Sequence, residues 1–171
     1  MIEGPRSRRL IGQLLFVLLF LLLLFLRLVP LTAGRIGWPG PDLALCLVLA
    51  WLLRRPEQVP ALTIALMFLV EDVLLWRPLG LWAAVVVLGT EAARRREPRW
   101  RELPFMVEWM RVATLMAMMM LANRIVLALF FLPLPALGQA LVQYGATVAA
   151  YPLVVGFLRW PLGLGRSVTE S

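Results

Sequence analysis

Two adjacent carboxylates, Glu71 and Asp72, stand inside an apolar segment and are the side chains most suited to chemistry. A carboxylate within a membrane-spanning segment costs on the order of several kcal/mol unless it is paired, so it marks a partner, a cavity or a function. Adjacent helical residues point about 100° apart, and the two acids are therefore expected to meet different partners. The candidates are Arg77, the start of the helix after Pro78, or an arginine within another helix. A structural or partner-docking role is favoured over a ligand site.

Other polar residues lie close to, or inside, apolar segments. Asp42 follows a proline and is expected to cap the helix that begins there. Glu108 and Arg111 are spaced i, i+3, which favours an ion pair near a membrane surface. Asn123 and Arg124 lie deeper in the same helix and are candidates to reach the third-helix carboxylates. The candidates for a partner site or pocket are Asp42, Glu71, Asp72, Arg77, Pro78, Gly80, Arg111, Asn123 and Arg124.

The chain lacks the residue types on which most enzymes depend. It has no histidine and one cysteine, Cys46, so a zinc or iron–sulfur site is not expected. Its three serines lie near the two ends of the sequence, and no nucleophile–base pair or glycine-rich phosphate loop is present. The sequence therefore predicts a protein that is not an enzyme and needs no cofactor.

The composition is that of an integral membrane protein. Of 171 residues, 61% are hydrophobic and 16% are charged, which leaves too little polar surface for a soluble domain. The net charge of +7 comes from arginines that stand between apolar runs, so nucleic acid is not expected as a partner. Six helices are predicted, at residues 10–29, 43–53, 61–76, 79–93, 105–132 and 136–160.

The arginines predict the orientation of these helices. If both termini are cytoplasmic, three arginines (Arg27, Arg35 and Arg77) lie at outer ends or loops, and twelve lie at inner ones. The twelve are Arg6, Arg8, Arg9, Arg54, Arg55, Arg94, Arg95, Arg96, Arg99, Arg101, Arg159 and Arg166. This imbalance predicts an all-α polytopic protein with N-in and C-in topology and with Glu71 and Asp72 near the outer surface.

A single membrane domain is expected at residues 10–160, between cytoplasmic tails at 1–9 and 161–171. The first helix is apolar on every side and is expected to face lipid, with Arg27 extending outward near its end. The second helix has eleven residues and reaches only about 17 Å, short of a bilayer core of roughly 30 Å. Pro152 predicts a kink inside the last helix.

Three surfaces suit contacts with other molecules. Small residues on one face of the last helix predict a helix-packing seam, and six methionines between residues 106 and 120 suit either a partner surface or ordinary packing. The seam comprises Gly138, Gly145, Ala149 and Gly156. An arginine cluster is expected at the inner membrane surface, where it would contact anionic lipids or a cytoplasmic protein. The cluster comprises Arg94, Arg95, Arg96, Arg99 and Arg101.

Taken in order, these features resemble the MreD family of bacterial rod-shape-determining membrane proteins. The resemblance covers nearly the whole chain. It is carried by Pro41-Asp42 before a short second helix, by Asp72 late in the third, and by Pro78-Leu79-Gly80 at the start of the fourth. It implies a multi-pass protein of the bacterial cytoplasmic (inner) membrane that belongs to the cell-elongation complex for peptidoglycan synthesis.

The resemblance also implies the partners. Such a protein binds the bitopic protein MreC and, through it, influences RodA, a class B penicillin-binding protein and the MreB filament. The family's fold is similar to that of the substrate-binding subunits of energy-coupling-factor transporters. A subunit that binds a small molecule or a lipid is therefore the alternative function.

Overall fold

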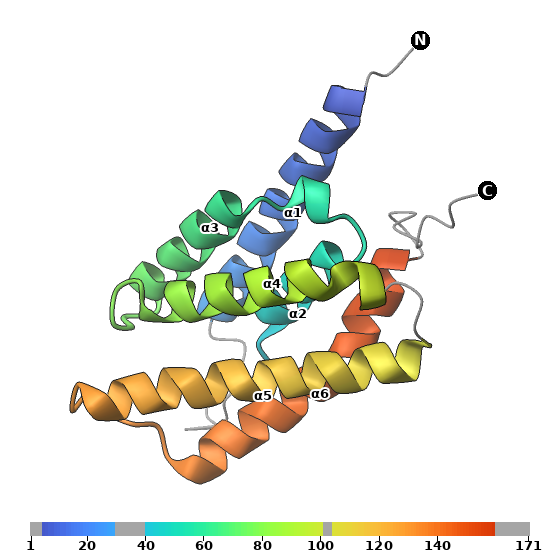
Figure 1. Ribbon diagram of the computed structural model, residues 1–171. Helices are drawn as coiled ribbons and strands as arrows, with labels where there is room; N and C mark the ends of the chain where they lie inside the picture. The colour runs from blue at the N-terminus through green and yellow to red at the C-terminus, as the bar shows by residue number, and fades with distance from the viewer. Residues whose placement is uncertain (1–4, 30–39, 101–103, 160–171) are drawn as a thin grey trace.

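The computed structural model describes residues 5–29, 40–100 and 104–159, which form six α-helices and one short 3₁₀ helix (Figure 1). The elements are α1 (Pro5–Leu28), α2 (Leu43–Leu52), η1 (Pro56–Gln58), α3 (Ala61–Leu74), α4 (Leu81–Trp100), α5 (Phe105–Leu129) and α6 (Leu137–Arg159). The predictions of an all-α fold and of six helices are confirmed. The predicted C-terminal tail, residues 161–171, lies outside the described residues.

Three helices are long and apolar enough to cross a membrane: α1 from Arg9 to Leu28, α5 and α6. The 10 residues of α2 reach only about 15 Å, and the 14 residues of α3 reach about 21 Å. The short second helix was expected from the sequence. Its place in the fold explains why it is tolerated, since nearly every residue of α2 is buried by neighbouring helices.

Several predicted helix boundaries were wrong. The first helix begins at Pro5 rather than at residue 10, so part of the predicted tail is helical. The fourth continues to Trp100, because arginine and glutamate are good helix formers and the polar residues after 93 prolong the helix. The third and fifth helices end earlier than predicted, at Leu74 and Leu129, each before an aromatic residue with positive φ.

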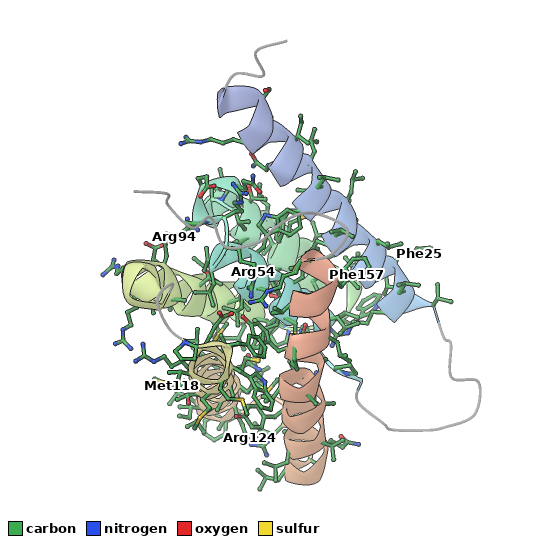
Figure 2. All side chains as sticks on the ribbon, turned by 90° about the vertical axis from the view of Figure 1, so that its right-hand side faces the viewer. Phe25, Arg54, Arg94, Met118, Arg124 and Phe157 are labelled. Atoms are coloured by element: carbon green, nitrogen blue, oxygen red, sulfur yellow. The ribbon has the colours of Figure 1, made fainter. Side chains whose placement is uncertain are left out.

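The expectation that α1 faces lipid did not include the face that the structure buries. One face of α1 packs into the core, where Phe16 meets Trp51 of α2 with ring centroids 5.7 Å apart. Phe20 meets Phe68 of α3 at 5.1 Å, in an edge-to-face arrangement that aromatic rings favour. The other face is exposed, and Phe25 projects from it in Figure 2.

The small residues of α6 do not form a seam against the other helices that the structure describes. Among the described residues, Gly138, Gly145 and Gly156 have no atom from outside their own stretch of helix within 4 Å of the position that a Cβ would take, and Ala149 is exposed. The helix instead packs through larger residues of its opposite face, which were not singled out from the sequence. These residues include Thr147, Ala150, Tyr151, Val155 and Leu158.

A close helix approach occurs elsewhere, at Gly89 of α4. A Cβ there would lie 2.6 Å from the Met119 Sδ of α5, so only glycine fits without movement of the methionine. The methionines of α5 divide between two roles, since Met116 and Met119 are buried whereas Met106, Met110 and Met118 are exposed. Packing and an exposed surface are therefore both present on this helix.

Candidate functional site

Glu71 is fully buried and paired with an arginine from α1. The Arg27 Nη1 donates to the Glu71 Oε1 at 2.7 Å, and the Arg77 Nη1 lies 3.6 Å from the same oxygen. The prediction of an arginine partner is confirmed, and Arg27 was missed because it was expected to extend outward. A buried carboxylate without a counter-charge is costly, which explains why Arg27 turns inward.

Asp72 has a different partner, as the helical geometry predicted. Its Oδ2 accepts a hydrogen bond of 3.2 Å from the backbone N–H of Ala83, in the first turn of α4. The backbone N–H groups of Gly80 and Trp82 also face this carboxylate. Asp72 therefore satisfies N–H groups that have no partner within α4, and its negative charge complements the positive end of the helix dipole.

Asp42 caps α2 as predicted. Its Oδ1 accepts a hydrogen bond of 3.1 Å from the Leu45 backbone N–H, and its own N–H donates to the Thr147 Oγ1 of α6 at 2.9 Å. The Arg27 Nη1 lies 3.7 Å from the same carboxylate oxygen. Sequence reasoning gave no reason to select Thr147, because the contact joins residues that are 105 positions apart.

The turns after α3 and α5 each contain an aromatic residue with a left-handed backbone conformation. Trp76 and Phe131 adopt positive φ values of 54° and 53°, and each side chain is 96% exposed. Arg77 then donates from its backbone N–H to the Asp72 carbonyl, in the 6→1 pattern that often ends a helix with glycine. Gly80 has φ of +79° and completes the α3–α4 turn, for which an L side chain would be strained.

A cavity of about 580 Å³ lies between these two turns and the start of α2. It brings together five of the residues predicted for a partner site: Asp42, Arg77, Pro78, Asn123 and Arg124. We call this part of the molecule, the cavity with the turns at 75–80 and 130–136, the hairpin end. Both turns are visible on the left of Figure 1.

Other predicted residues lie outside the cavity lining. Glu71 and Asp72 contact residues next to the cavity instead. Glu71 pairs with Arg77, and Asp72 accepts a hydrogen bond from the start of α4. Gly80 shapes the turn and is not a lining residue. Arg111 is exposed on α5 and does not line the cavity.

The cavity wall combines cationic and apolar groups. The Arg77 guanidinium stands over the Trp82 ring, 5.9 Å from its centroid, and the Arg124 Nη1 donates to the Pro135 carbonyl at 2.9 Å. Asn123 and Gln143 add amide groups. The rest of the wall is largely apolar and comes from both turns and from α4, α5 and α6. It includes Trp76, Leu81, Met120, Leu127, Leu132 and Ala140.

A buried polar cluster at the opposite end was not predicted. The Arg54 Nη2 donates to the Glu108 Oε1 at 3.2 Å, and the Tyr151 hydroxyl donates to the same oxygen at 2.9 Å. All three side chains are almost fully buried, and Arg54 lies among the central side chains in Figure 2. Glu108, expected at the membrane surface, is therefore a buried residue that joins the end of α2 to α5 and α6.

The arginine cluster also differs from its prediction. Arg94 does not extend toward lipid, because its guanidinium donates to the carbonyls of Pro56 and Val59 at 2.9 and 2.6 Å. It thereby fastens α4 to the turn between α2 and α3. Arg95 and Arg96 are exposed and remain candidates for anionic lipid. Arg101 and the side chain of Arg99 lie outside the described residues.

Among residues 5–29, 40–100 and 104–159, no group of three or more His, Cys, Asp or Glu side chains is placed to hold a metal ion. The hairpin end therefore offers donors, apolar walls and fixed acids rather than a ligand set for a metal. The chain matches no protein-family model, no curated protein sequence and no solved structure.

Proposed function

We propose that this chain is an MreD-type subunit of the bacterial cell-elongation complex, in which it acts as a scaffold or regulator without catalysis. The observation that carries the proposal is the convergence of Asp42, Arg77, Pro78, Asn123 and Arg124 on one cavity. The sequence resemblance to the MreD family supports it. In this account the hairpin end docks the membrane anchor of MreC, and the contacts with RodA, the class B penicillin-binding protein and MreB pass through the complex.

The proposed topology has six membrane helices, with both termini in the cytoplasm of the bacterial cell. Arg94 contacts the turn that follows Arg54 and Arg55, so these three arginines lie at one end of the helices. Arg27 and Arg77 lie at the other end, the hairpin end. The positive-inside rule favours the cytoplasm for the first end. The cavity then opens toward the outer face, where a bitopic partner emerges from the membrane.

Glu71 and Asp72 have a structural role in this mechanism. Glu71 is bound to Arg27 and Asp72 to the start of α4, each through one oxygen, while the Glu71 Oε2 and the Asp72 Oδ1 are buried without a hydrogen-bond partner among the described residues. The two acids fix Arg77 and the turn at Pro78, and these residues with Asn123 and Arg124 form the surface that a partner helix meets. The ion pairs and hydrogen bonds that these acids make hold the surface in one arrangement.

A second function is favoured by the cavity itself. Its volume of about 580 Å³ lies within the range of small-molecule sites, roughly 300–1,000 Å³, and its wall combines apolar groups with a few polar ones. A substrate- or lipid-binding subunit similar to those of energy-coupling-factor transporters has such a pocket. That function also requires a cytoplasmic ATPase module as a partner.

Affinity purification from native membranes separates the two functions. The tagged chain is expected to recover MreC and the elongation proteins, whereas an ATPase module recovered without them would overturn the scaffold proposal. The variant Asn123→Leu changes the cavity wall and is expected to lower MreC recovery about tenfold, as for a central interface residue. Arg95→Gln, on the exposed face of α4, is the matched control and is expected to leave recovery unchanged.

A further inference from the structure

Within the part of the chain that the structure describes, one arginine of the cavity wall has no carboxylate within 4 Å. Arg27, Arg54 and Arg77 each lie within 4 Å of a carboxylate, at 2.7, 3.2 and 3.6 Å respectively. Arg124 also lines the cavity and is partly buried, but among the described residues its guanidinium is bonded only to the neutral carbonyl of Pro135. A guanidinium held inside a membrane domain is costly unless an anion faces it.

The acids near the cavity are already engaged. Asp42 binds the Leu45 N–H and lies 3.7 Å from Arg27, while Glu71 accepts from Arg27. Asp72 is not part of the cavity wall and binds the start of α4. These contacts do not supply the counter-charge for Arg124, so an anionic ligand is the simplest group to complete the site.

The surroundings indicate that this anion belongs to a lipid. Trp76 and Phe131 stand at the tips of the two turns, and exposed aromatic rings of this kind are typical of the membrane–water interface. Leu79 and Leu129, close to the same turns, are each 72% exposed and suit contact with acyl chains. The cavity mouth therefore lies near headgroup depth, with apolar surface below it.

We propose that the cavity binds the phosphate group of an anionic phospholipid between Arg124 and Arg77, with the glycerol and upper acyl chain along its apolar wall. A guanidinium presents paired N–H donors that match two phosphate oxygens. Free phosphate shares this chemistry but leaves the apolar wall in contact with water, so the lipid is the expected source. The inference concerns the cavity that both proposed functions use, but its test needs neither MreC nor an ATPase, so a failure of lipid binding and a failure of partner recovery are separate results.

The test uses the purified, delipidated full chain in a neutral detergent. Short-chain phosphatidylglycerol, phosphatidylcholine of the same chain length and sodium phosphate are titrated separately, and binding is followed by tryptophan fluorescence. Trp76 and Trp82 line the cavity and are expected to report occupancy. Saturable binding of phosphatidylglycerol, at least about tenfold tighter than that of the other two probes, is the expected result for a charge-assisted site.

Two variants locate the site. Arg124→Gln removes the charge and Asn123→Asp adds an opposing one, and each is expected to weaken phosphatidylglycerol binding about tenfold. Asn123→Asp keeps the shape of the side chain, so it tests the site even if Arg124→Gln does not fold. Arg9→Gln removes an exposed charge near the start of α1, away from the cavity, and is expected to bind as wild type does.

Three results would overturn the proposal. The first is unchanged binding by both cavity variants, and the second is an equal loss in Arg9→Gln, which would indicate a general surface effect. The third is sodium phosphate binding as tightly as the lipid, which would assign the site to a free anion.

Discussion

The ion pair between Arg27 and Glu71 is expected to be a main support of the hairpin end. Arg27→Met keeps most of the side-chain volume but leaves the fully buried Glu71 with Arg77 at 3.6 Å as its nearest cation. Removing one partner of a fully buried pair costs about 3–5 kcal/mol, whereas exposed pairs contribute about 0–1 kcal/mol. Because the Arg27 side chain is 27% exposed and Arg77 remains, we expect a loss of about 2 kcal/mol.

A double-mutant cycle separates this pair from its surroundings. Glu71→Gln retains a hydrogen-bond acceptor for Arg27 and is expected to cost about 1 kcal/mol. The variant Arg27→Met/Glu71→Gln has no unpaired buried charge at these positions. It is therefore expected to lose less than the sum of the two single variants, with a coupling energy of about 1–2 kcal/mol.

The unfolding midpoint in one detergent and at one scan rate provides the measurement. For a chain of this size, 2 kcal/mol corresponds to a decrease of about 4–8 °C in Tm. Arg95→Met, which changes an exposed residue of the same type, is the control and is expected to change Tm by less than about 2 °C. A Tm for Arg27→Met equal to that of the control, or strictly additive losses in the cycle, would refute the assigned role of the pair.

Two further predictions concern packing away from the cavity. Arg54→Met removes the cation that pairs with the buried Glu108 carboxylate and is expected to cost about 3–5 kcal/mol. Tyr151→Phe removes one hydrogen bond to the same carboxylate and is expected to cost about 1 kcal/mol. Equal losses in the same unfolding assay would contradict the role assigned to this cluster. Gly89→Ala places a methyl group against a methionine of α5 and is expected to cost about 1 kcal/mol, while Gly145→Ala adds a methyl group in open space and is expected to be neutral or stabilising by about 0.5–1 kcal/mol. A destabilised Gly145→Ala would show that this face is packed.

The local features of the fold were predictable from the sequence because local chemistry determines them. Prolines and glycines indicated most of the helix ends, and the Pro-Asp pair indicated the cap of α2 that Asp42 provides. The 100° step between neighbouring helical residues correctly predicted that Glu71 and Asp72 have different partners. The boundaries failed where the chain ends a helix with an αL aromatic residue, as at Trp76, because that position more often holds glycine.

The contacts between distant helices were not predictable in this way. Arg27 was assigned to the membrane surface because its own helix is apolar, although the buried Glu71 of α3 determines where its side chain lies. Arg94 was assigned to lipid, and the carbonyls that it binds belong to a turn more than 30 residues earlier. A single sequence records which residues need partners but not which partners the fold supplies.

The candidate site was predictable in part, because it combines local sequence signals with contacts between distant helices. Of the nine residues predicted for a partner site or pocket, five line one cavity, whereas Glu71, Asp72, Gly80 and Arg111 do not; the five are Asp42, Arg77, Pro78, Asn123 and Arg124. The apolar residues of the same wall gave no signal, because in the sequence they resemble any other membrane-helix residue. The small-residue stripe of α6 gave a signal that the fold does not use within this chain.

Site-specific photo-crosslinking in native membranes tests the central claim most directly. A photoreactive residue replaces Asn123 in the cavity wall or, as the comparison, Arg95 at the opposite end, and the crosslinked products are identified by mass spectrometry. We predict that the first position crosslinks to the membrane anchor of MreC and that the second does not. Crosslinks to MreC only from position 95, or to an ATPase module and no elongation protein, would contradict the assignment of the hairpin end as the docking site.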